Sequence, residues 1–172
     1  ELANKMALFR SHGITRDPVR MTREADGPWY YQQIDLGYNY RMTELQAALG
    51  VSQMERLDYY VSRRHQLACR YNELLATLPI ITPWQHPDSY SGLHLYVIRL
   101  QLDKISSSHR QVFEALREQG IGANLHYIPV HTQPYYQRMG FKVGDYYEAE
   151  NYYREAISLP MYQTLTDEQQ DK

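Results

Sequence analysis

The spacing of apolar residues predicts helices in the first half of the chain. Leu2, Met6 and Phe9 recur at helical spacing and indicate a first helix. Residues 14–36 are polar and carry turn signals, so we expect a long loop there. A capping-box pattern at residues 43–46 opens a second apolar series over residues 45–78, which predicts one or two long amphipathic helices.

After residue 90 the pattern alternates between strand and helix. Residues 94–100 predict a strand, and residues 106–120 predict a helix that begins at serines and ends at a glycine. Residues 121–127 predict a second strand. Short helices are expected at residues 135–139 and 146–157. This alternation is typical of a small α/β unit.

The chain divides, on this pattern, within the long helical region near residue 60. Its first residues already read as a helix, and a capping box at residues 166–169 begins another helix close to Lys172. We therefore expect the chain to be a piece of a longer protein.

Composition narrows the classes of protein. A formal net charge of -2 gives no basic footprint for nucleic acid. The single cysteine, Cys69, excludes a disulfide framework and a cysteine-based zinc site. No apolar run approaches the ~20 residues that span a bilayer. We expect a cytoplasmic protein with neither a nucleic-acid nor a membrane partner.

One candidate site lies in residues 37–43, between the long loop and a helix start. Backbone N–H groups at a helix N-terminus favour an anion. The amide of Asn39 can donate to that anion, and Arg41 offers a fork for phosphate or carboxylate. The alternative is an ordinary helix start, with Arg41 in a salt bridge and the neighbouring tyrosines packed.

A second candidate is the segment of residues 126–136, which follows the second predicted strand. Ligand groups often lie at such strand ends in α/β proteins. His126, Tyr127 and His131 supply donors and acceptors in a segment stiffened by prolines. Two histidines five residues apart suggest zinc, but no third ligand is evident, so we expect no metal. The alternative is a polar loop whose histidines have hydrogen-bond partners.

Other polar residues have simpler explanations. Residues 63–65, Arg-Arg-His, are expected on a solvated helix face. Cys69 follows apolar neighbours and is expected in the core. Asp145, Glu148 and Glu150 are explained as charges in the first turn of a helix.

Four blocks of sequence together resemble one family. Residues 10–14, 36–50, 120–136 and 157–162 are similar, in this order, to the nucleotide-sugar aminotransferases of the DegT/DnrJ/EryC1/StrS family. The similarity extends along essentially the whole chain and is strongest to the branch that works in pseudaminic acid biosynthesis.

The resemblance implies an α/β protein of the aspartate-aminotransferase fold, which is fold type I of the pyridoxal-phosphate enzymes. Residues 1–60 would end the large cofactor-binding domain and carry a dimer-interface loop, and residues 61–172 would form the small C-terminal α/β domain. The resemblance also implies pyridoxal 5'-phosphate as cofactor, a homodimer, glutamate as amino donor, and a UDP-linked deoxy-keto sugar as acceptor.

The resemblance assigns roles to five residues. Asn39 would bind the cofactor phosphate of the opposite subunit. Arg41, His126, Tyr127 and His131 would contact the sugar nucleotide.

None of the four lysines lies in the context that the family's Schiff-base lysine requires. Lys5 is on a helix, and Lys104, Lys142 and Lys172 lie far downstream. The resemblance therefore places that lysine upstream of Glu1, so we expect this piece to be inactive alone. The alternative is a non-catalytic binding or dimerisation module of a family member that lacks the lysine.

Overall fold

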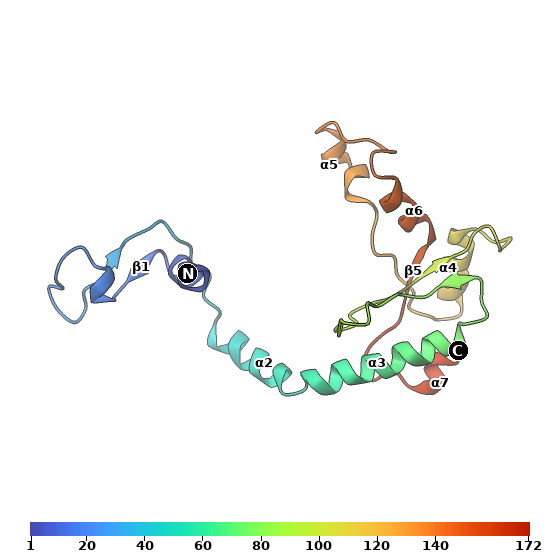
Figure 1. Ribbon diagram of the computed structural model, residues 1–172, viewed down its shortest axis with the longest axis horizontal. Helices are drawn as coiled ribbons and strands as arrows, with labels where there is room; N and C mark the ends of the chain where they lie inside the picture. Colours follow the sequence, from blue (N-terminus) through green and yellow to red (C-terminus); the bar gives the residue numbers. More distant parts are fainter. The chain divides into compact units, whose positions relative to one another are not determined.

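The computed structural model describes residues 1–172, which form two compact units, Glu1–Glu55 and Arg56–Lys172. Figure 1 labels their elements along the chain. The division falls between two helices at residues 55–56, slightly before the boundary expected near residue 60. No helix combines the length and apolar character that a membrane crossing requires. Each unit is described by itself.

The first unit contains two helices and a short hairpin. Helix α1 covers Leu2–Phe9, and α2 covers Glu44–Met54. Strands β1 (Ile14–Thr15) and β2 (Gln32–Gln33) pair antiparallel, with the 3-10 helix η1 (Pro18–Arg20) between them. The segment expected as a loop therefore begins and ends in a two-stranded sheet, whose strands are too short to produce an alternating pattern.

Two glycines allow main chain to approach main chain in this unit. Gly13 has a φ of 71°, and a Cβ built on it would lie 1.9 Å from the carbonyl oxygen of Asp35. A Cβ on Gly37 would lie 2.3 Å from the nitrogen of Gly13. Neither position accommodates a side chain without moving the backbone.

Helix α2 begins at the capping box that the sequence predicts. Thr43 Oγ1 accepts from Gln46 N, and Gln46 Oε1 accepts from Thr43 N. No residue of α2 is buried, and its large apolar side chains are exposed. These are Leu45, Leu49, Val51 and Met54.

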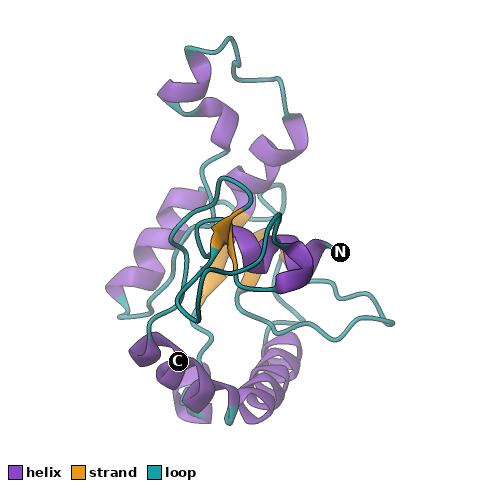
Figure 2. Cartoon of the chain, turned by 90° about the vertical axis from the view of Figure 1, so that its left-hand side faces the viewer, coloured by secondary structure: helices purple, strands orange, loops and turns teal.

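The second unit forms around a three-stranded antiparallel sheet of order β3-β4-β5. The strands are β3 (Ile80–Ile81), β4 (Tyr96–Leu100) and β5 (Ala156–Leu159). Figure 2 draws strands in orange and helices in purple. The helices are α3 (Leu57–Leu74), α4 (His109–Glu118), η2 (Val130–Thr132), α5 (Pro134–Gln137), α6 (Tyr147–Glu155) and α7 (Asp167–Gln170).

The prediction of a second strand at residues 121–127 is wrong. Within residues 121–127 only Asn124 pairs, through an isolated bridge to Ser158. The third strand is instead β5, which begins where α6 ends and takes residues expected as the end of a helix. Ala156, Ile157 and Ser158 are all buried, so β5 lacks the alternation that distinguishes a strand from a helix.

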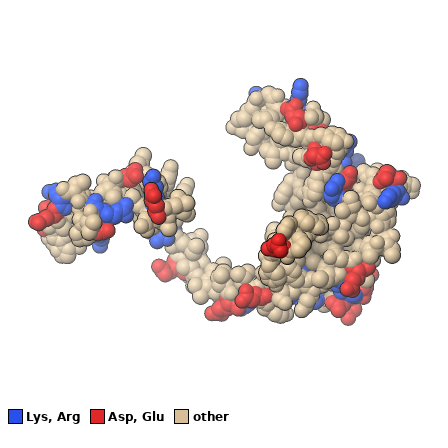
Figure 3. Space-filling view, viewed as in Figure 1, with Lys and Arg blue, Asp and Glu red and all other residues tan.

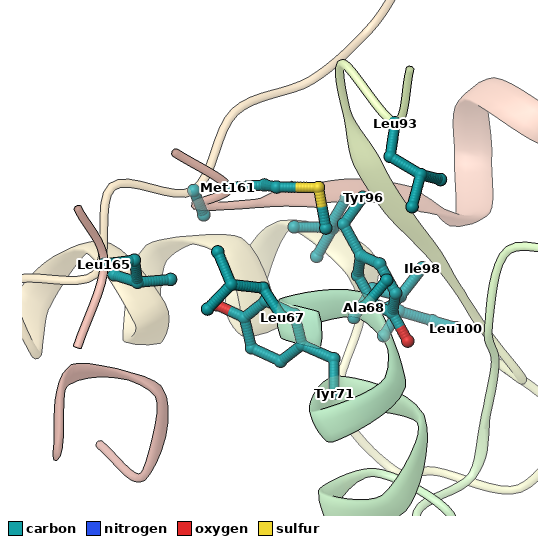
Figure 4. Close-up of a cluster of buried hydrophobic side chains, with 11 residues drawn as sticks. Leu67, Ala68, Tyr71, Leu93, Tyr96, Ile98, Leu100, Met161 and Leu165 are labelled. Atoms are coloured by element: carbon teal, nitrogen blue, oxygen red, sulfur yellow. The ribbon is translucent and has the colours of Figure 1, made fainter. Parts of the chain in front are cut away.

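The core of this unit lies between α3 and one face of β4 (Figure 4). Alternate residues of β4 are buried, and they meet a buried stripe of α3. Side chains from α4 cover the cluster further. The residues that meet are Leu67, Ala68 and Tyr71 of α3 and Tyr96, Ile98 and Leu100 of β4.

Two expectations for α3 are wrong. Cys69 is exposed rather than in the core, because the buried stripe passes through its neighbours. Arg64 and His65 are half-buried rather than solvated. Arg64 Nη1 donates to the carbonyl oxygens of Leu93 and His94, both at 2.9 Å, so the arginine fixes a connecting segment to the helix.

The core predicts a large effect of truncating Leu67, which is fully buried. Leu67→Ala should lower the free energy of unfolding by about 2–5 kcal/mol, because transfer free energy is lost and a cavity remains. Urea denaturation measures this difference. Cys69→Ala, on the exposed face of the same helix, is the control and should stay within about 0.5 kcal/mol. Equal effects of both changes would contradict the assignment of the core.

The phenol of Tyr96 predicts a loss of stability at high pH. Burial raises the pKa of Tyr96 from 10.0 to about 12, because the phenolate would be desolvated. The unfolded chain ionises first, so stability should fall as pH rises from 10.0 to about 12. Denaturation midpoints across this interval should fall less in Tyr96→Phe, and an identical decline in both proteins would refute the role of Tyr96.

Candidate functional site

Asn39 lies on an extended segment whose position is set by the backbone. Its neighbours pair with the exit of α1: Tyr38 N donates to Phe9 O at 2.6 Å, and Tyr40 N donates to Arg10 O at 2.9 Å. Asn39 itself bridges Ser11. The side chain of Asn39 is exposed and has no hydrogen-bond partner in the chain. Its amide is therefore free to donate to an anion.

The tyrosines on either side of Asn39 point to a common side. The rings of Tyr38 and Tyr40 stack at 5.3 Å with 12° between their planes. Together with α1 they line a pocket of about 580 Å³ that includes Arg10. Because side chains alternate along an extended segment, Asn39 points away from this pair.

Arg41 does not make the salt bridge that was the alternative to anion binding. It is exposed and makes no salt bridge, so its guanidinium carries an unpaired charge beside Asn39. The amides of Thr43 and Gln46 are already used by the capping box. Anion binding at this place therefore depends on the side chains of Asn39 and Arg41 rather than on those two amides.

The second candidate segment lies in the other unit, where Ser158 contacts its first residue. His126 Nδ1 lies 2.7 Å from Ser158 Oγ. Ser158 is a buried residue of β5 and exchanges two backbone hydrogen bonds with Asn124, of 2.8 and 3.0 Å. The ring of His126 is thus fixed to the sheet, and Tyr127, whose ring lies edge-on to it at 4.6 Å, is 71% exposed.

His131 is buried and carries a short contact to a carboxylate. Its Nε2 donates to Glu150 Oε1 at 2.8 Å, and the same oxygen accepts from Gly144 N at 2.6 Å. These hydrogen bonds, first that of His131 and then that of Gly144, lower the pKa of Glu150. Direct contact of His131 with a substrate stays a prediction, since this nitrogen already has a partner.

An apolar pocket of about 430 Å³ lies beside His131. Aromatic side chains form most of its wall, and the His131 and Tyr146 rings are 4.9 Å apart. The lining residues are Val130, His131, Tyr136, Phe141, Tyr146 and Ala149. Such a wall suits the apolar face of a ring or an alkyl group.

Sequence reasoning missed Ser158 and Glu150. Ser158 belongs to a block that resembles the family, so that similarity was a signal. Glu150 was explained by the helix dipole alone, and nothing in the local sequence reveals its partner 19 residues away.

The surface carries mixed charge and no metal cluster. On the face drawn in Figure 3, positive and negative side chains are interspersed over each unit. No group of three or more histidine, cysteine, aspartate or glutamate side chains could hold a metal ion.

Curated relatives match nearly the entire chain. It is 37% identical over 174 residues to the spore coat polysaccharide biosynthesis protein SpsC of Bacillus subtilis, with 99% of this chain and 44% of the relative covered. It is 32% identical over 167 residues to a UDP-4-amino-4,6-dideoxy-N-acetyl-beta-L-altrosamine transaminase of Helicobacter pylori, with 96% and 41% covered. The chain thus spans less than half of the length of these relatives.

Solved structures show the same fold. The Helicobacter pylori aminotransferase PseC, involved in the biosynthesis of pseudoaminic acid, superposes with a TM-score of 0.80 at 30% identity, with 98% of this chain and 43% of PseC covered. The PMP form of the sugar aminotransferase Spr1654 of Streptococcus pneumoniae gives 0.83 at 26%, with 99% and 40% covered. The fold is that of the fold type I aminotransferases, and pyridoxal phosphate is the cofactor of this group.

The family model of the DegT/DnrJ/EryC1/StrS aminotransferases matches residues 1–172. The blocks of residues 10–14, 36–50, 120–136 and 157–162 all lie within this match. The chain therefore belongs to the DegT/DnrJ/EryC1/StrS aminotransferase family.

Proposed function

We propose that the protein containing this chain transfers an amino group from glutamate to a UDP-linked deoxy-keto sugar, using pyridoxal phosphate. The product would serve nonulosonic acid or surface-glycan biosynthesis. The names of the relatives support this class of reaction. Among the structural observations, the exposed and unpartnered amide of Asn39 gives the strongest support, because its NH2 group is free to donate to a phosphate oxygen.

Asn39 and Arg41 suit anionic groups of different size. Asn39 would donate to the cofactor phosphate of the opposite subunit, and its backbone pairing with Ser11 would hold the donor in place. Arg41, exposed and unpaired, would bind the phosphates of the sugar nucleotide through its planar fork. The bound cofactor supplies the electron sink for moving the amino group, which no side chain of this chain provides.

The segment of residues 126–131 would contact the sugar nucleotide from the second unit. His126 and Tyr127 would offer a ring nitrogen and a phenol, and His131 would lie at the other end of this contacting segment. The first unit would be the end of the large domain, with its dimer-interface loop, and the second the small domain. The exposed apolar residues of α2 support an interface with a partner subunit in a homodimer.

The lysine that binds the cofactor would lie upstream of Glu1. Lys5 stands on α1, and Lys104, Lys142 and Lys172 are exposed residues of the second unit.

Spectroscopy of the full-length protein tests the proposed function. Protein loaded with pyridoxal phosphate should show a visible absorbance band that changes when glutamate is added and recovers when a UDP-linked keto sugar follows. Loaded protein whose band ignores glutamate would contradict the proposal and favour a non-catalytic binding or dimerisation module.

Replacing Asn39 tests its phosphate role. Asn39→Ala in the full-length enzyme should weaken retention of the cofactor, because a charge-assisted hydrogen bond of about 1.5–3 kcal/mol is lost. Equilibrium dialysis or fluorescence titration of the cofactor measures the change. Asn4→Ala, an exposed asparagine on α1, is the matched control. Equal affinities in both variants would remove Asn39 from the site.

A further inference from the structure

The segment of residues 126–131 is attached at both of its ends by side chains from other elements. His126 at one end contacts Ser158 of β5, with Nδ1 and Oγ 2.7 Å apart. His131 at the other end donates to Glu150 of α6 at 2.8 Å. Both contacts are largely screened from water, since Ser158 is 3% exposed and His131 7% exposed.

The first attachment rests on the central strand. Ser158 pairs with Val97 of β4, and its backbone also bonds to Asn124. The backbone of Ser158 therefore has little freedom to move, and the contact with the Ser158 hydroxyl fixes the position of the His126 ring.

The second attachment also leads to the central strand. Glu150 Oε1 accepts from both His131 Nε2 and Gly144 N. One carboxylate therefore links the segment before α5 to the segment after it. Further along α6, Glu155 accepts from Arg99 of β4 at 2.7 and 3.0 Å. The helix that carries Glu150 is thus fixed to the same strand as Ser158.

Between the attachments the side chains are exposed. Tyr127 is 71% exposed, Ile128 47% and Val130 58%. The hydroxyl of Tyr127 makes no hydrogen bond within the chain. A segment anchored at both ends, with an exposed and unpartnered phenol between them, is arranged to present that phenol to a ligand.

We propose that Ser158 and Glu150 are positioning residues that hold residues 126–131 so that Tyr127 meets the nucleotide sugar. This inference rests on the proposed function. Neither residue touches the ligand. Ser158 acts through His126, and Glu150 acts through His131 and Gly144.

The test uses the full-length protein with Ser158→Ala, Glu150→Ala and Glu150→Gln. UDP affinity is measured by calorimetry, and backbone amide exchange of residues 126–131 is followed by mass spectrometry. Both alanine variants should exchange faster in this segment and bind UDP about tenfold more weakly, because anchoring bonds are lost. Glu150→Gln keeps an acceptor oxygen and should stay close to the unsubstituted protein.

Two variants of exposed residues control for nonspecific effects. Glu148→Ala lies in the same helix as Glu150, and Ser106→Ala lies in a connecting segment. Neither side chain has a hydrogen-bond partner, so both variants should match the unsubstituted protein. The KM for the keto-sugar nucleotide should rise in the alanine variants at positions 150 and 158, while the rate of the glutamate half-reaction stays unchanged.

Unchanged amide exchange of residues 126–131 in both alanine variants would overturn the proposal. Faster exchange with unaltered UDP affinity and KM would also overturn it, since the anchors would then serve structure alone. Failure of the unsubstituted protein to bind UDP, with exchange still accelerated in the variants, would overturn the proposed function and leave the anchors as a structural finding.

Discussion

The antiparallel pairing of β4 with β5 is the constraint on which the second unit depends. It places Tyr96, Ile98 and Leu100 on the face that α3 covers. Between them, Arg99 is aligned with the end of α6. Burial of apolar area stabilises the packing of β4 against α3, and charge-assisted hydrogen bonding between Arg99 and Glu155 fixes the end of α6 to β4. Strand pairing thus connects the hydrophobic core to the elements that carry the candidate site.

The first unit is organised by its main chain instead. Leu8 is its one buried large apolar side chain, so hydrophobic burial contributes little to its form. Backbone hydrogen bonds between the exit of α1 and residues 34–40 hold it together. The exposed apolar residues of α2 give this unit surface that a larger assembly could bury.

Local signals in the sequence predicted helix starts well. The capping boxes predicted at Thr43 and Thr166 are present, because each requires residues only three positions apart. The helix expected to begin at serines begins at Ser108, which also forms a capping box. Strand β5 was not predicted, since its residues are buried without alternation and its partner lies far along the chain.

The candidate site was predicted only in part, because some of its contacts join residues far apart in the sequence. Residue chemistry singled out Asn39, Arg41 and the segment of residues 126–131, and the family resemblance assigned their roles, which remain predictions. Glu150 and the carbonyl contacts of Arg64 depend on partners at long sequence separation. No pattern in a single sequence encodes such partners.

The close approach of Gly13 to Asp35 and of Gly37 to Gly13 has an evolutionary consequence. Two residues without side chains permit the close backbone packing beside which Asn39 pairs with Ser11, although neither would touch a ligand. Substitution of Gly13 or Gly37 is therefore restricted by the need to keep the side chain of Asn39 in its place. In a family tree, such positions should change as rarely as the residue they serve.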